Sequence, residues 1–94
     1  MERGFYVLAY DISDDKRRQK IARVCESMAE RVQGSVFEGY LTPAELEKLA
    51  KKVQKVMNKE EDSLRIYLLC SDCRTKISMI GCGSVTPPPG VVIV

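Results

Sequence analysis

The stretch GFYVLAYDISDDKRR, residues 4–18, decides the fold of this chain. Apolar residues run without a break from Phe5 to Tyr10, so both faces of the predicted strand are apolar, as in a central strand of a sheet. Asp11 ends this run, and a basic helix is predicted directly after it. Because a carboxylate is costly to bury in a core strand, we expect Asp11 at the exposed end of the strand, where α/β folds hold their chemistry.

The residues after Asp11 carry the signals of a helix start. Ser13 is the predicted N-cap, and Asp14 and Asp15 suit the positive end of the helix dipole. The helix therefore explains these two acids. Asp11 precedes the cap and has no such explanation, so it is the candidate functional carboxylate.

Length and composition indicate one soluble domain. The chain has 94 residues, enough for a modest core, and a dimer would bury further surface. With 45% hydrophobic and 30% charged residues it is typical of a globular protein. We expect no membrane segment. The first residues lack the apolar region and the cleavage site of a signal peptide, which predicts a cytoplasmic protein.

The positive charges are unevenly distributed. The net charge of +2 is too small to identify a nucleic-acid binder. However, five cations follow Asp11 within the eight residues 16–23, and Arg31 comes later. Such a run is either the solvated face of a helix or a surface that contacts phosphates, and the sequence leaves both readings open. The predicted phosphate contacts are Arg17, Arg18, Lys20 and Arg31.

Two further patterns follow the first strand. Residues 14–30 are predicted to form a helix with one apolar stripe, made by Ile21, Val24, Cys25 and Met28. Two short strands are predicted on either side of Gly34 and Ser35, because glycine supplies the positive φ that a type II′ hairpin turn needs.

The next helix has the clearest start in the chain. Thr42 is the predicted N-cap, Pro43 takes the first helical position and Glu45 completes a capping box. A polar loop over residues 58–62 and a strand over residues 64–69 follow, and this strand is apolar enough to be central. The order predicts an α+β, ferredoxin-like βαββαβ fold, with two helices on one face of an antiparallel sheet. The other face would favour a partner.

The C-terminal part is predicted to add a strand. Residues 76–81 form a short strand that completes a domain of residues 1–82. Residues 83–94 form an arm, with prolines followed by the apolar tip Val91–Val94. Such an arm can add a strand to another sheet, including that of a second protomer, and the alternative is a disordered tail.

Four cysteines raise the question of zinc or redox chemistry. Cys70 and Cys73 form a CxxC pair and Cys82 follows, but the chain has no histidine, so a fourth zinc ligand would have to be Cys25 or come from another chain. Cys25 lies on the apolar stripe and is expected in the core. A redox CxxC precedes a helix start, whereas this pair is predicted in a turn between two strands. Reduced thiols are favoured, and a zinc site or a disulfide remains an alternative.

The possible chemistry is narrow. Without histidine there is no imidazole base and no Ser–His or Cys–His nucleophile, and no phosphate-binding glycine loop is present. The remaining candidate for chemistry is Asp11, which is followed by the run of basic residues. Mg²⁺ is often held by one or two carboxylates with water and phosphate oxygens. Two Asp11 residues facing each other in a two-fold dimer would position water for phosphodiester hydrolysis.

Three stretches resemble the CRISPR-associated protein 2 family, the small adaptation subunit of CRISPR systems. They are YDISDDKRRQKIA from Tyr10, ERVQGSVFEGYLTPAELEKL from Glu30 and EDSLRIYLLC from Glu61. The resemblance runs from about Phe5 to Gly81 and agrees with the ferredoxin-like prediction. It implies a symmetric homodimer in which the C-terminal strand of one protomer joins the sheet of the other.

The resemblance also implies an activity. Members of the family have been described as metal-dependent nucleases acting on single-stranded RNA or double-stranded DNA, with the strand-end aspartate, here Asp11, as metal ligand. The further positions that match those linked to activity are Tyr10, Arg18, Lys20, Arg31 and Phe37. Lys20 stands where the family can have arginine, and lysine does not make the bidentate phosphate contact of arginine.

A second function is implied by the same resemblance. The family also acts as a non-catalytic bridge, in which the dimer sits between two copies of the CRISPR integrase and holds the DNA destined to become a spacer. Asp11 would be dispensable for that role. Without the resemblance, the residues would indicate a small dimeric module that binds RNA or protein. All three functions need a dimer or a charged surface, so the sequence does not separate them.

Overall fold

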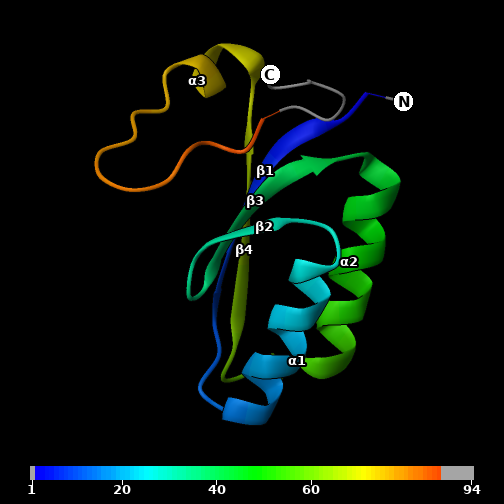
Figure 1. The fold of residues 1–94 in the computed structure, drawn as a ribbon. Helices are drawn as coiled ribbons and strands as arrows, with labels where there is room; N and C mark the ends of the chain where they lie inside the picture. The colour runs from blue at the N-terminus through cyan, green and yellow to red at the C-terminus, as the bar shows by residue number, and fades with distance from the viewer. Residues whose placement is uncertain (1, 88–94) are drawn as a thin grey trace.

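A computed structural model gives the fold, and residues 2–87 are described. The elements in chain order are β1 (Gly4–Asp11), α1 (Asp15–Glu26), β2 (Glu30–Gln33), β3 (Val36–Leu41), α2 (Pro43–Val56), β4 (Ser63–Leu69) and α3 (Ser71–Thr75). Within this part of the chain the strands form one antiparallel sheet in the order β2-β3-β1-β4. Helices α1 and α2 lie together on one face of the sheet (Figure 1). The predicted α+β, ferredoxin-like fold is confirmed.

Strand β1 is central, as predicted. It pairs antiparallel with β3 on one side and with β4 on the other. Leu8 and Tyr10 are buried in the core between the sheet and the helices, and Phe5 is buried as well. Asp11, the last residue of β1, is exposed. The strand therefore carries its only acid out of the core at its end.

Helix α2 begins where the sequence predicts. Thr42 Oγ1 accepts a hydrogen bond from the Glu45 backbone N–H at 3.1 Å, and Glu45 Oε1 accepts one from the Thr42 N–H at 2.9 Å. This reciprocal pair is the predicted capping box, with Pro43 at the first helical position. Leu49 and Val53 of its apolar stripe are fully buried against the sheet.

Both predicted ends of the first helix are wrong. Asp14, not Ser13, is the N-cap of α1, because its carboxylate accepts the Arg17 N–H at 2.9 Å. The helix ends at Glu26 rather than at residue 30, since the chain turns at Ser27 and passes closely over β3. A Cβ on Gly39 would lie 3.3 Å from Cα of Ala29, so glycine permits this close approach.

The predicted hairpin forms, but its turn differs from the expected one. Strands β2 and β3 flank Gly34 and Ser35, which confirms the two short strands. Gly34 does not adopt a positive φ, so the type II′ turn is wrong. The pairing register shifts between Arg31 and Gln33, and this irregularity takes up the extra residue in β2.

Strand β4 lies at the edge of the sheet, whereas the sequence predicted a central position. Within residues 2–87 it pairs only with β1. Ile66, Tyr67 and Leu68 are correspondingly exposed, whereas Leu64 is partly buried and packs against the core. Apolar composition therefore did not indicate burial within this chain.

The strand predicted over residues 76–81 does not form. The chain turns into α3 directly after β4 and then runs irregularly, with Gly81 and Gly83 at φ of 99° and 113°. Thr86 donates to Oε1 of Glu38 from both its N–H and its hydroxyl at 3.0 Å, which fastens this segment to β3. The open face of the sheet is thus partly covered.

The CxxC pair lies at the start of α3, and not in a turn between two strands as predicted. Cys70 is the N-cap of α3, and Cys73 lies one turn further on.

Most of the predicted arm, residues 83–94, falls outside the described residues, so its added strand and its exchange between protomers remain predictions. Among the described helices, none is both long and apolar enough for a membrane span.

Candidate functional site

Asp11 lies at the end of β1 opposite Ser63 of β4. Its side chain is exposed, and the ion pairs formed by neighbouring arginines go to other acids, Glu61, Asp62, Asp15 and Glu26. No group of three or more potential metal-ligating side chains exists within residues 2–87. One exposed carboxylate still suits Mg²⁺, which keeps most of its water ligands. Asp11 is therefore an exposed carboxylate that belongs to no such group in the described part of the chain.

Arg18 is anchored to the backbone directly after Asp11. Its Nη1 donates to the carbonyl oxygen of Ile12 at 2.9 Å, and its Nη2 pairs with the carboxylate of Asp15. The Ile12 carbonyl belongs to the residue directly after Asp11. The guanidinium is therefore anchored to the backbone directly after the candidate acid, and the Arg18 side chain remains 43% exposed.

Arg17 has a different position from Arg18, although the two are neighbours in sequence. Its Nε and Nη2 donate to the two carboxylate oxygens of Asp62 at 2.8 and 3.2 Å, and Nη2 also pairs with Glu61 at 3.1 Å. The Asp62 side chain is fully buried and also accepts the Asn58 N–H at 2.8 Å. Arg17 thus connects α1 to the loop before β4.

The electrostatics of Asp62 agree with this connection. The hydrogen bonds from Arg17 hold the pKa of the Asp62 carboxyl below its usual value, with further help from the backbone N–H groups of Asn58 and Ser13. Sequence reasoning missed Asp62, which was assigned only to a polar loop. No local signal could have found it, because its partner Arg17 lies 45 residues away in the chain.

Tyr10, Phe37 and Arg31 come together beside the hairpin. The rings of Tyr10 and Phe37 have centroids 6.1 Å apart, and Cζ of Arg31 lies 5.2 Å from the Phe37 centroid. The Tyr10 hydroxyl donates to the Gly34 carbonyl at 3.0 Å, and burial raises its pKa. Arg31 also pairs with Glu26 at 2.8 Å. The two aromatic side chains therefore position Arg31 and the hairpin.

Lys20 is the most solvent-oriented of the predicted phosphate contacts. It lies on α1 with an exposed side chain, and none of the ion pairs within residues 2–87 includes it. The structure thus divides the predicted contacts. The three predicted arginines are all paired with acids, whereas Lys20 is exposed.

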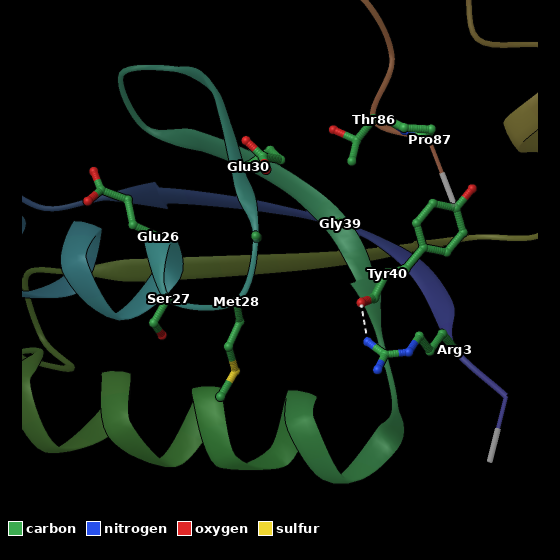
Figure 2. Close-up of a pocket in the computed structure, with 10 residues that line it drawn as sticks. Arg3, Glu26, Ser27, Met28, Glu30, Gly39, Tyr40, Thr86 and Pro87 are labelled. Carbon is green, nitrogen blue, oxygen red and sulfur yellow. Dashed lines mark hydrogen bonds between the residues drawn. The ribbon is translucent and has the colours of Figure 1, made fainter. Parts of the chain in front are cut away.

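A pocket lies at a different place in the molecule. Figure 2 shows this cavity of about 350 Å³, between the α1–β2 connection, β3 and Thr86–Pro87. Arg3 reaches across one side, where its Nη1 donates to the Tyr40 carbonyl at 3.4 Å. None of the site residues predicted from the sequence lines this pocket. Asp11 accordingly lies on an exposed edge and not in this cavity.

Comparison with known families identifies the chain. The model of the family described as CRISPR associated protein Cas2 matches residues 4–77, which is most of the sequence. The chain belongs to the Cas2 family. This confirms the resemblance found in the sequence, and the match spans β1 through α3.

Individual relatives agree with the family assignment. A protein from Synechocystis named CRISPR-associated endoribonuclease Cas2 is 46% identical, over 95% of this chain and 97% of its own length. The crystal structure of a hypothetical protein from Thermus thermophilus is 38% identical, covers 88% of this chain and 96% of its own, and has a TM-score of 0.78. A chain of a partial Cas6-RT-Cas1–Cas2 complex is 28% identical, with 97% and 99% covered and a TM-score of 0.77.

Proposed function

We propose that this Cas2 family member acts in CRISPR spacer acquisition as a homodimer that binds nucleic acid, and that Asp11 supports Mg²⁺-dependent hydrolysis of RNA or DNA phosphodiesters. The observation that carries the proposal is the exposed Asp11 carboxylate at the end of β1, followed directly by Ile12, whose backbone carbonyl anchors the Arg18 guanidinium. The endoribonuclease name of the Synechocystis relative supports the same activity. The proposal keeps the cytoplasmic location expected from the sequence.

The proposed dimer completes the site. Asp11 of each protomer would hold the metal together with water and phosphate oxygens, because no group of three or more potential ligands exists within residues 2–87 of one chain. The metal would supply an activated water and neutralise charge on the phosphate. Arg18 and Lys20 would contact phosphates of the bound nucleic acid. Strand β4 supports the dimer, because its exposed Tyr67 and Leu68 lie on an edge strand.

A specific observation favours a second function. The chain has the same fold as the Cas2-like chain of a complex that contains Cas1, with 97% of this chain covered. Asp11 belongs to no group of three or more potential metal-ligating side chains within residues 2–87, and Arg17, Arg18 and Arg31 are all paired with acids of the same chain. These features suit a non-catalytic scaffold, in which the dimer bridges the CRISPR integrase and the double-stranded DNA of a prespacer.

Cleavage assays separate the two functions. Purified wild type and Asp11→Asn are incubated with labelled single-stranded RNA and double-stranded DNA, with Mg²⁺ or with EDTA, and the dimer mass is measured in parallel. For the nuclease we expect cleavage that needs Mg²⁺ and falls to background in Asp11→Asn while the dimer persists. Asp72→Asn, an exposed aspartate on α3, is the matched control and retains the wild-type rate. Equal cleavage in Asp11→Asn would remove Asp11 from catalysis and leave the scaffold.

Binding assays test the proposed phosphate contacts. Lys20→Gln removes an exposed cation, so we expect the slope of log affinity for duplex DNA against log salt to fall by about 1 with the fold unchanged. Arg17→Gln removes the partner of buried Asp62, so its main effect is a lower thermal midpoint. If the protein is a scaffold, Asp11→Asn should bind duplex DNA as tightly as wild type does. It should also co-elute with the integrase as wild type does. A salt slope unchanged by Lys20→Gln would contradict its phosphate contact.

A further inference from the structure

Two exposed thiols remain outside the proposed function. Cys70 directly follows Leu69, the last residue of β4, and Cys73 lies three residues later in α3. Both side chains are exposed. They are the only pair of cysteines that the described chain brings into one turn, since Cys25 is buried and Cys82 lies in another segment.

The first turn of α3 directs the two thiols toward each other. The helical turn closes at Cys70, whose carbonyl accepts the Arg74 N–H at 2.9 Å. Cys70 has the extended conformation of an N-cap, and its Sγ accepts the backbone N–H of Cys73 at 3.4 Å. Residues three apart in a helical turn have Cβ atoms about 5–6 Å apart. A disulfide joins Cβ atoms about 3.5–4.5 Å apart, so the bond requires a slight tightening of this turn together with rotation of the two side chains.

The two sulfurs differ in acidity. The pKa of the Cys70 thiol is lowered, mainly by the hydrogen bond from the Cys73 N–H and then by that from the Cys73 thiol. The pKa of the Cys73 thiol is raised by its interaction with the Cys70 sulfur. Cys70 is therefore the more acidic thiol of the pair.

We propose that Cys70 and Cys73 form a redox-active dithiol that is oxidised to an intramolecular disulfide by exchange with small disulfides. Cys70 is the attacking thiol, because it is exposed and its sulfur is the acceptor of the Cys73 N–H. Cys73 is the resolving thiol, one turn away and also exposed. The substrate class is a low-molecular-weight disulfide such as glutathione disulfide.

The exchange is balanced in two steps. The Cys70 thiolate attacks one sulfur of the small disulfide, forms a mixed disulfide and releases one small thiolate. Cys73 then loses its proton and attacks the Cys70 sulfur, which forms the Cys70–Cys73 bond and releases the second thiolate. The two released thiolates take up the two protons of the protein thiols. In total two protein thiols are oxidised, and one small disulfide is reduced to two thiols.

The other two cysteines serve as internal comparisons. Cys25 is buried in the core, and this burial raises its pKa to about 11, so it does not react in the folded chain. Cys82 is exposed like the pair, but it lines a groove with residues of β2 and β3. If exposure alone decided reactivity, Cys82 would react as fast as Cys70. If the pairing of Cys70 with Cys73 decides it, Cys82 reacts more slowly.

The test uses the full chain equilibrated in glutathione buffers of increasing oxidising strength, then alkylated and analysed by intact mass and peptide mapping. We expect two thiols to disappear together, with a mapped Cys70–Cys73 disulfide and no bound glutathione. Cys82→Ser is expected to behave in the same way. In Cys73→Ser the reaction stops after its first step, so one glutathione stays on Cys70.

Cys70→Ser keeps a good N-cap residue, so its fold is expected to persist, which circular dichroism checks. In this variant Cys73 is expected to react several-fold more slowly than Cys70 does in Cys73→Ser. Equal glutathione uptake on Cys70, Cys73 and Cys82, or a disulfide that joins two chains, would overturn the proposal. The readout is mass and not cleavage, so its failure is distinct from failure of the proposed nuclease or scaffold function.

Discussion

Strands β3 and β4 flank the same central strand, yet they are buried very differently. Both pair antiparallel with β1. Along β3, buried residues alternate with partly exposed ones, and Phe37 is completely buried. Along β4, no residue is buried, and Leu68 is 62% exposed. Position in the sheet, and not apolar composition, decides which strand joins the core of a single chain.

The two strands are accordingly held in place by different forces. Strand β3 lies under the helices, where Phe37 and Leu41 bury apolar area. Strand β4 is held by its backbone pairing with β1 and by Asp62, which directly precedes it and binds Arg17 of α1. We therefore expect mutations to destabilise β3 through lost packing and β4 through lost electrostatics.

The largest expected loss of stability comes from a substitution in β3. Phe37→Ala leaves a cavity in the core and removes the ring beneath Arg31, so we expect a loss of about 3–5 kcal/mol in the free energy of unfolding. Urea unfolding followed by circular dichroism measures it. Tyr67→Ala in β4 is the control, with an expected loss under about 1 kcal/mol at concentrations where the chain is monomeric. Equal losses would show that β4 is as buried as β3 in solution.

The next largest loss of stability is expected from a substitution just before β4. Asp62→Asn keeps the shape of the side chain but removes its charge, so the thermal midpoint at neutral pH should fall by several degrees. The pKa of Asp62 is below its ordinary 3.8 because Arg17 binds the charged form. This stabilisation is therefore complete above the ordinary pKa and is lost as the pH falls through the lower pKa of the folded state.

Hydrogen exchange measures the effect of Asp62 on β3 and on β4 separately. Amides of β4 are expected to lose protection before those of β3 when wild type is acidified below about pH 4. In Asp62→Asn the same early loss is expected already at neutral pH. The difference between variant and wild type should therefore shrink as the pH is lowered. A difference that stays constant with pH would show that Asp62 does not act through its charge.

The sequence predicted the elements whose causes are local. The unbroken apolar run placed β1 in the centre, and the capping box of Thr42 and Glu45 placed the start of α2. The stripe on α1 predicted that Cys25 is buried. Exposure of Asp11 also followed locally, since a charged residue at the end of an apolar strand avoids the desolvation cost of the core.

The features that sequence reasoning missed depend on distant parts of the chain. The ion pair of Arg17 with Asp62 spans 45 residues, so neither partner signals the other. Residues 76–81 have the composition of a strand, but within residues 2–87 no strand edge pairs with them, and α3 forms before them instead. The wrong location of the CxxC pair followed from that error. The roles of Asp11, Arg18 and Lys20 remain predictions, because they depend on a partner molecule.

Leu68→Asp is expected to change the stability of a single chain least. It is also the variant that tells most about the role of β4. Leu68 contributes little to the core because it is 62% exposed, so the far-UV circular dichroism of the monomer should not change. If the β4 edge is the dimer interface, a buried charge there is unfavourable, and sedimentation analysis should show a shift from dimer to monomer. Gln54→Asp adds the same charge on the exposed face of α2 and should leave the mass unchanged. A dimer that persists in Leu68→Asp would place the interface on another surface, and the apolar residues of β4 would then need a different partner.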